Sequence, residues 1–145
     1  MSGVPKSKRH YTDRLEVLVT MKNVRKELTK YLLKDYDKMT QNGELPKELL
    51  RNLVIAEINY LRDITDHVTI ANNIYVTCQK EYEERRLHQD YAIAICRRLA
   101  NEIEYMMEIA ENININKYAR SIEHINKTVN MIKAWRKSDN RLKNK

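Results

Sequence analysis

Residues 41–50 read QNGELPKELL, and this stretch contains the only glycine and the only proline beyond residue 5. Gly43 and Pro46 therefore mark a turn, because both residue types interrupt regular secondary structure. No glycine or proline occurs between Lys47 and Lys145. A β-rich fold needs such residues at its many tight turns, so their distribution predicts long helices and an all-α fold.

Apolar residues recur every three or four positions on both sides of this turn, which is typical of amphipathic helices. The first helix is expected to start with Thr12 or Asp13 as its N-cap and to end before Asn42. Pro46 suits the first turn of a second helix. The two apolar stripes are expected to consist of Leu15, Leu18, Met21, Val24, Leu28, Tyr31 or Leu32, Tyr36 and Met39, and then of Leu49, Leu50, Leu53, Ile58, Leu61 and Ile64.

Two further segments have the same periodicity. The β-branched residues and asparagines of residues 72–77 favour helix less, so the second connection is placed there. A third helix is expected from about Glu81, and the asparagine-rich break at residues 111–116 separates it from a fourth. Their stripes are expected to be Leu87, Tyr91, Ile95, Leu99, Ile103, Met106 and Ala110, and then Tyr118, Ile122, Ile125, Val129 and Ile132. Four helices with three short connections predict an antiparallel four-helix bundle.

The composition is that of a single globular domain of 145 residues. Its longest apolar run, residues 91–96, is far shorter than the roughly 20 residues needed to span a bilayer. No apolar stretch follows the basic N-terminus, so no secretory signal is expected. Cys78 and Cys96 form neither a disulfide framework nor a metal motif. These features predict a cytoplasmic protein with reduced thiols and no membrane contact.

The net charge of +7 is concentrated at the two ends, since residues 1–14 carry +3 and residues 133–145 carry +5. We therefore expect basic tails at residues 1–11 and 137–145 on either side of a bundle that spans residues 12–136. Basic ends on a neutral body are typical of nucleic-acid contact, and solubilising tails have the same composition. The candidate RNA-binding bases are Lys133, Arg136, Lys137, Arg141, Lys143 and Lys145, followed by Lys6, Lys8 and Arg9.

No residue pattern indicates catalysis. The four histidines do not form the Glu-x-x-His motifs of carboxylate-bridged metal bundles, and two glycines cannot supply a phosphate-binding loop. Asp63, Asp66 and His67 fall close together on one helix, where a solvated face is the expected role. We expect no enzyme activity, no catalytic residues, no cofactor, no metal and no small-molecule substrate.

The third helix is apolar on more than one side, because residues 92–96 widen its stripe. Such a helix packs inside its own bundle and also against a neighbouring subunit, so Tyr91 and Ile95 are candidates for subunit packing. Trp135 continues the fourth stripe, and we expect it either to cap the core or to fill a subunit contact.

Two pairs of arginines lie on the third helix. Arg97 and Arg98 lie beside the apolar run and are candidates for contact with RNA or with a second subunit. Arg85 is four residues after Glu81, which predicts an ordinary ion pair on the helix surface.

Three stretches resemble a known family: GVPKSKRHYTDRLEVLV at residues 3–19, EYEERRLHQDYAIAIC at residues 81–96 and MIKAWRKSDNR at residues 131–141. They are similar to the accessory variability determinant (Avd) proteins of diversity-generating retroelements. These proteins belong to a wider four-helix-bundle family that includes the ribosomal-RNA intervening-sequence proteins. The resemblance covers most of the chain and includes no catalytic signature.

The resemblance implies a basic bundle that assembles as a homopentamer and has no enzymatic activity of its own. It also implies binding to a reverse transcriptase and its template RNA, with cDNA or DNA as alternative nucleic acids. Its role would be to support the error-prone, adenine-directed cDNA synthesis of mutagenic retrohoming. Two other functions remain open from the residues alone: an rRNA- or ribosome-associated bundle without a polymerase, and a protein–protein adaptor with solubilising tails.

Overall fold

The structure, a computed structural model, describes the backbone of residues 6–40, 46–110 and 112–143, and the side chains from Glu16 onward within these ranges, apart from Thr40. Within these ranges the chain forms four α-helices: α1 (Lys6–Thr40), α2 (Lys47–Asn73), α3 (Gln79–Ile109) and α4 (Ile115–Ser138). A short 3-10 helix, η1 (Asp139–Leu142), continues α4. The described residues contain no strand, and the predicted all-α four-helix bundle is confirmed.

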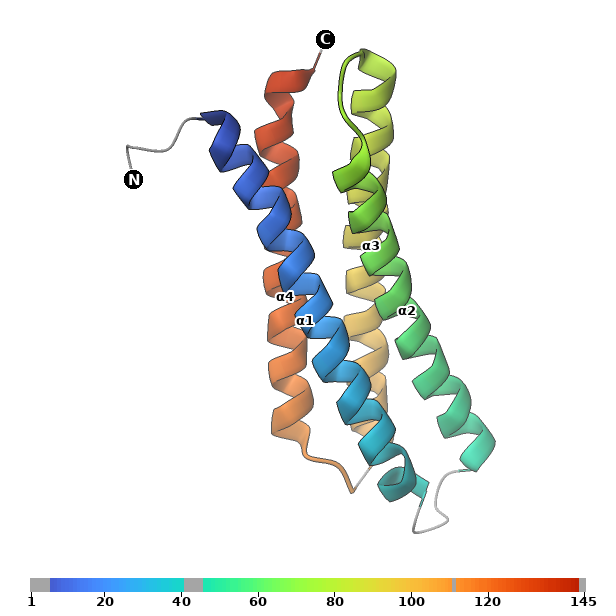
Figure 1. Ribbon diagram of the computed structural model, residues 1–145. Coiled ribbons are helices and arrows are strands. Elements are labelled where there is room, and N and C mark those ends of the chain that lie inside the picture. Colours follow the sequence, from blue (N-terminus) through green and yellow to red (C-terminus); the bar gives the residue numbers. More distant parts are fainter. Residues whose placement is uncertain (1–5, 41–45, 111, 144–145) are drawn as a thin grey trace.

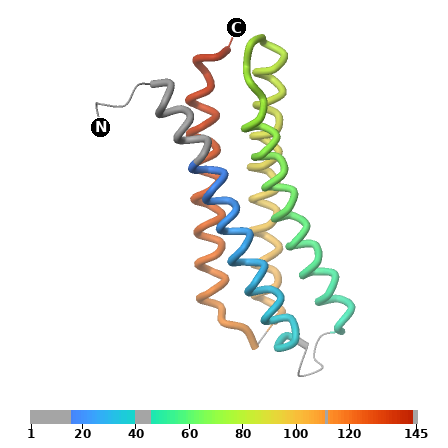
Figure 2. Tube along the Cα trace, viewed as in Figure 1, coloured from blue at the N-terminus to red at the C-terminus, as the bar shows by residue number. Residues whose placement is uncertain are grey.

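Consecutive helices run in opposite directions, and each packs against two neighbours (Figure 1). α1 lies between α2 and α4, and α3 lies between the same two helices on the other side. The connection between α2 and α3, residues 74–78, lies at the same end of the bundle as η1, as the trace in Figure 2 shows. The topology therefore places the last described residues of the chain beside the start of α3.

One apolar core runs the length of the bundle, and every helix contributes to it. Leu28 of α1, Leu61 of α2, Leu99 of α3 and Trp135 of α4 are completely or almost completely buried. Each large apolar side chain of this kind stabilises the fold by about 1.5–3 kcal/mol. The stripe predicted for α4 supplies four of its seven buried residues, and the stripe predicted for α2 supplies four of nine, since Leu49 is exposed and Ile58 is only half-buried. No helix in the described ranges combines the length and the apolar character that a membrane span requires.

The starts predicted for α2, α3 and α4 agree with the structure to within about two residues, and the start predicted for α1 does not. α2 begins directly after Pro46, and α4 begins after Asn114, whose side-chain oxygen accepts a hydrogen bond from the backbone N–H of Lys117 at 3.3 Å. α1 begins at Lys6, so residues 6–11 of the predicted tail over residues 1–11 are helical, and its first five residues lie outside the described part of the chain. No helix-breaking residue lies between Lys6 and the expected start, so the helix extends back to it. The predicted end at Asn42 and Gly43 lies outside the described residues.

The first half of α3 departs from its predicted stripe. Leu87 and Tyr91 are 48% and 47% exposed, whereas Leu99 is fully buried, as predicted. The inward positions of this half are occupied by polar side chains, notably Arg85 and Gln89, which are buried. Both side chains donate hydrogen bonds to Asp139 near the C-terminal end of the chain, and Leu87 and Tyr91 face outward instead.

Candidate polyanion-binding surface

The C-terminal basic segment is folded against α3. The carboxylate of Asp139 is buried and accepts hydrogen bonds from Arg85 Nη1 at 3.0 Å and from Gln89 Nε2 at 2.9 Å. The Arg85 guanidinium also donates to the carbonyl oxygen of Ile74 in the connection between α2 and α3. The side chains of Arg85 and Asp139 are only 3% and 2% exposed. This buried ion pair fixes η1 to the end of the bundle.

The ion pair corrects two predictions. The segment from Lys137 to Lys143 is not a free tail, because α4 continues to Ser138 and η1 follows it. Arg85 is buried and forms an ion pair with Asp139, so it does not lie on the helix surface as predicted. Glu81 Oε1 accepts a hydrogen bond from the backbone N–H of Thr77 at 3.1 Å and another from its hydroxyl, and these bonds lower the pKa of Glu81.

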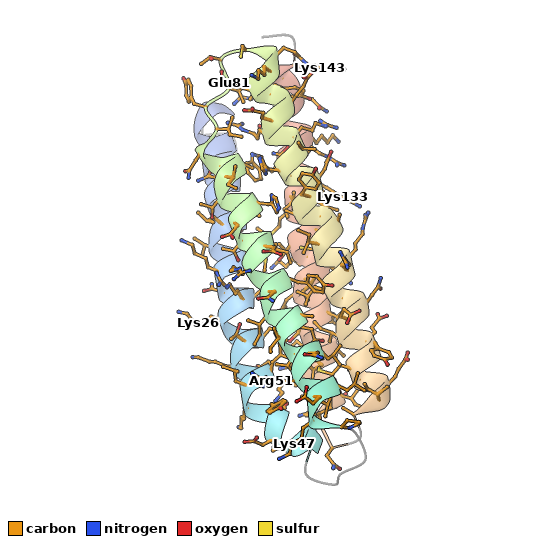
Figure 3. The ribbon with its side chains drawn as sticks, turned by 90° about the vertical axis from the view of Figure 1, so that its right-hand side faces the viewer. Lys26, Lys47, Arg51, Glu81, Lys133 and Lys143 are labelled. Atoms are coloured by element: carbon orange, nitrogen blue, oxygen red, sulfur yellow. The ribbon has the colours of Figure 1, made fainter. Side chains whose placement is uncertain are left out.

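The predicted C-terminal bases surround this folded end. The exposed ones are Lys133, Lys137, Arg141 and Lys143. Figure 3 shows Lys133 and Lys143 pointing away from the bundle. Arg136 is half-buried, and its guanidinium forms an ion pair with Asp90 of α3, so less of its charge is available to a ligand. Lys145 lies outside the described residues.

The remaining predicted bases lie on other parts of the bundle. Lys6, Lys8 and Arg9 belong to the first turns of α1, but their side chains lie outside the described part of the structure. Arg97 and Arg98 are exposed on α3, about 18 Å along the helix axis from the buried ion pair. The Arg98 guanidinium lies 5.2 Å from the ring centre of Tyr60 on α2. Arg97 and Arg98 are therefore not part of the C-terminal group of bases.

α1 has a basic surface that the count of charges along the sequence missed. Its outer side forms a shallow hollow lined by Val19, Lys22, Asn23, Arg25, Lys26, Thr29 and Lys30. Lysine occupies every fourth position from Lys22 to Lys38, and each step of four residues turns only about 40° around the helix, so Lys22, Lys26 and Lys30 lie on one side. Figure 3 shows Lys26 pointing outward. This spacing is the sequence signal by which the surface could have been found.

A groove between α1 and α4 borders the hollow. It is lined by Thr20, Asn23, Val24 and Glu27 of α1 and by His124 and Lys127 of α4. His124 Nδ1 lies 4.0 Å from Glu27 Oε1 in this groove, and the two side chains are 42% and 40% exposed. Tyr31 lies nearby, but its ring packs against Lys117, whose Nζ is 4.5 Å from the ring centre.

Counting charge by helix shows how the excess is distributed. α1 carries ten bases and five acids, and α4 carries six bases and one acid. α2 carries three bases and four acids, and α3 carries five bases and seven acids. The two adjacent helices α1 and α4 therefore hold +10, whereas α2 and α3 hold −3. The charge is separated between two sides of the bundle, and the neutral body in the sequence count conceals this separation.

The described residues offer little to nucleophilic or metal chemistry. No three His, Cys, Asp or Glu side chains among them lie close enough together to hold a metal ion. Cys96 is buried, and burial raises the pKa of its thiol to about 12, which keeps it protonated near neutral pH. The α1–α4 side instead presents exposed cations on rigid helices, an arrangement suited to binding anions by electrostatic attraction.

The three candidates for subunit packing have different environments. Trp135 has no exposed surface in the single chain, so it belongs to the core of its own bundle. Of the two roles expected for Trp135, this burial supports the one in the core. Tyr91 is 47% exposed and Ile95 is half-buried, so both have surface that a second subunit could cover.

Comparisons of the chain with protein-family models, with curated proteins and with solved structures found no match. The surface itself and the resemblance of the three sequence stretches are therefore the grounds for assigning a function.

Proposed function

We propose that this chain is the non-catalytic accessory protein of a diversity-generating retroelement, and that it binds the template RNA and the reverse transcriptase in the cytoplasm. The separation of charge between the α1–α4 side and the α2–α3 side carries the RNA-binding part of the proposal. The resemblance of residues 3–19, 81–96 and 131–141 to the Avd proteins supports the retroelement part.

RNA would lie along α1 and the outer side of α4, where lysine and arginine side chains contact its phosphates. Each neutralised phosphate releases condensed counterions, so the affinity would fall steeply with salt concentration. The described lining of the α1–α4 groove includes one aromatic ring, that of His124, and the ring of the neighbouring Tyr31 packs against Lys117, so the groove offers little surface for base stacking. The contacts would therefore go to the backbone, and RNA shape would provide the selectivity.

The buried ion pair supports this mechanism by holding the C-terminal bases in place. Arg85 and Asp139 fix η1 against α3, so Lys137, Arg141 and Lys143 project from a folded end. Bases on a fixed scaffold lose less conformational freedom on binding than bases on a flexible tail. A homopentamer would present five such surfaces to one RNA and increase its affinity further.

The test is RNA binding as a function of salt for two charge-neutralised variants. One is Lys22→Gln with Lys26→Gln and Lys30→Gln on α1, and the other is Lys137→Gln with Arg141→Gln and Lys143→Gln at the C-terminal end. Each lost phosphate contact should reduce the slope of log K against log salt by about 0.7–0.9, so each triple variant should lose about 2–3. Truncation before Trp135 would be a poor test, because it removes a core residue as well as the bases.

The matched control removes three exposed bases of α2, on the other side of the bundle: Lys47→Gln, Arg51→Gln and Arg62→Gln. It lowers the net charge by the same amount and keeps good helix formers at all three positions. We expect its salt slope to stay close to that of the unmodified chain. If all three variants lose the same slope, binding follows net charge alone and the α1–α4 side is not the RNA site.

The polymerase part needs its own experiment, because RNA binding alone would also fit an rRNA-associated bundle. The chain would be used to capture the reverse transcriptase of a diversity-generating retroelement, with and without RNase treatment, and the mass of the chain's assembly would be measured in solution. We expect capture that survives RNase and a mass five times that of one chain. Capture that disappears with RNase would argue against direct binding to the polymerase.

A further inference from the structure

A histidine pair joins α2 and α3 on the side away from the proposed RNA surface. His67 Nδ1 of α2 and His88 Nδ1 of α3 are 2.9 Å apart, a hydrogen-bond distance, and both side chains are half-buried. The two rings are stacked, with centres 5.1 Å apart. Tyr91 packs against both of them, with its ring centre 5.2 Å from that of His67 and 6.3 Å from that of His88. The three rings form one cluster at the protein surface.

The number of protons on the pair decides whether the hydrogen bond can exist. A neutral imidazole has one N–H donor and one acceptor nitrogen, so two neutral rings can form an Nδ1–H···Nδ1 bond. A first added proton keeps this bond, because the charged ring donates to the neutral one. A second added proton makes both Nδ1 atoms donors and places two positive rings in contact. The pair then loses its hydrogen bond and gains a repulsion.

The surroundings of the pair favour the state with fewer protons. Burial and the neighbouring His88 lower the pKa of His67, and Asp63 and Asp66 on its own helix partly offset this effect. From α3 the facing groups are His88 and Tyr91, and Glu84 lies one turn before His88 on the exposed side of that helix. None of the described side chains on α1 or α4 contributes to the shift. Because the pKa of His67 is lower when folded, acid weakens this contact as the pH falls below about 6.5.

We propose that the His67–His88 pair is a proton-operated contact that positions Tyr91. With at most one extra proton on the pair, the stacked rings hold α2 and α3 together and support the Tyr91 ring. Binding of a second extra proton opens the pair and releases Tyr91, which changes the exposed face of α3 that also carries Leu87. The proposal does not depend on what binds the α1–α4 side.

The test is an NMR titration of the full chain from pH 8 to pH 4.5, following the histidine and Tyr91 ring signals with a metal chelator present. Two interacting groups release their protons in two macroscopic steps that belong to the pair. We expect the Tyr91 signals to move with the lower step and to stay unchanged through the upper one. A single step near 6.5 for both histidines, with Tyr91 unmoved, would overturn the proposal.

Two variants separate the hydrogen bond from the charge. His88→Asn places an uncharged amide near the Nδ1 position, so Tyr91 should keep its position at all pH values while the pKa of His67 moves toward 6.5. His88→Leu removes the partner altogether, so its Tyr91 signals at pH 8 should already resemble those of the unmodified chain in acid. The reciprocal His67→Asn should also abolish the movement. If Tyr91 still moves at the same pH in His88→Asn, the pair is not the cause and the proposal fails.

Discussion

Buried carboxyl groups have cationic partners where α4 contacts its neighbours. The buried carboxyl group at the contact between α2 and α3 has no such partner among the described residues. Asp35 of α1 accepts hydrogen bonds from Tyr118 and Lys117 of α4, at 2.8 and 2.7 Å. Asp139, just after α4, is paired with Arg85 of α3. Glu57 of α2 is equally buried, but neither of its carboxylate oxygens has a hydrogen-bond partner among the described residues.

The difference appears in the ionisation of these groups. Burial opposes the ionisation of Asp35, but the hydrogen bonds from Lys117 and Tyr118 outweigh it and lower the pKa. Burial, reinforced by the negative charge of Glu102, raises the pKa of Glu57 to about 9. α4 is thus held in place by ionised groups, whereas the core beside α2 contains an acid that stays protonated at neutral pH. Substitutions at these groups or at their partners should therefore have different effects on stability.

The largest loss of stability is expected from Arg85→Met, which leaves the Asp139 carboxylate buried without its cation. Removing one partner of a buried ion pair typically costs about 3–5 kcal/mol. The measurement is the free energy of unfolding in urea at pH 7. Arg136→Met is the matched control, because its ion pair with Asp90 joins the same two helices at the surface and should contribute less than about 1 kcal/mol. Equal losses would mean that the Asp139 pair is no more important than a surface contact.

The next effect has the opposite sign, because Glu57→Gln should stabilise the bundle. The folded chain keeps its proton on Glu57 up to about pH 9, whereas the unfolded chain releases it near pH 4.5. The unmodified protein therefore loses stability as the pH rises from 4.5 to 9, and a glutamine at this position does not titrate. At pH 7 the free energy of unfolding of the variant should exceed that of the unmodified chain by about 3 kcal/mol.

Urea unfolding of Glu57→Gln and of the unmodified chain at pH 4, 7 and 8.5 checks this prediction. The difference in free energy of unfolding between the variant and the unmodified chain should be small at pH 4 and larger at pH 7 and at pH 8.5. Glu102→Gln is a useful companion, since it removes the charge that reinforces the shift and should narrow the gap slightly. A gap that does not depend on pH would show that Glu57 is ionised in the folded bundle.

Lys117→Met should have a smaller effect at the contact between α1 and α4. The variant removes one of the two donors to Asp35, and a hydrogen bond to a charged group contributes about 1.5–3 kcal/mol. The low pKa of folded Asp35 means that this stabilisation exists above about pH 4 and is lost as the pH falls through the folded value. The variant should therefore be less stable than the unmodified chain at pH 7, and the two stabilities should become similar near pH 2. Thermal unfolding at the two pH values measures this difference.

The bundle could be predicted from the sequence because its signals are local. Helical periodicity and the scarcity of glycine and proline revealed the helices, and asparagines marked the breaks at residues 72–77 and 111–116. The buried ion pair could not be predicted in this way, because Arg85 and Asp139 are 54 residues apart and share no periodic pattern. Arg85 also had a plausible surface partner in Glu81, four residues before it. The spacing of charged residues along the helix therefore wrongly predicted an exposed side chain.

The candidate site was predicted only in part, for a related reason. The C-terminal bases stand out as a run, whereas the lysines of α1 are spread over residues 22–38 among acids and apolar residues. A charge count along the chain averages them against the acids of α2 and α3. The spacing of these lysines marks one basic side of α1, but that α1 and α4 are neighbours and form one basic surface follows from tertiary packing.

Leu87→Gln on α3 and Leu33→Gln on α1 should change the stability of the fold least. The two variants also compare the exposed faces of these two helices directly. Both side chains are largely exposed, at 48% and 61%, so neither change should alter the free energy of unfolding by more than about 0.5 kcal/mol. If subunits pack through the α3 face, as the exposure of Tyr91 suggests, only Leu87→Gln should weaken assembly, because it places an amide in an apolar contact. Sedimentation velocity over a range of concentrations would measure this directly. Dissociation caused by Leu33→Gln alone would instead move the subunit contact to α1, where it would compete with the proposed RNA surface for the same helix.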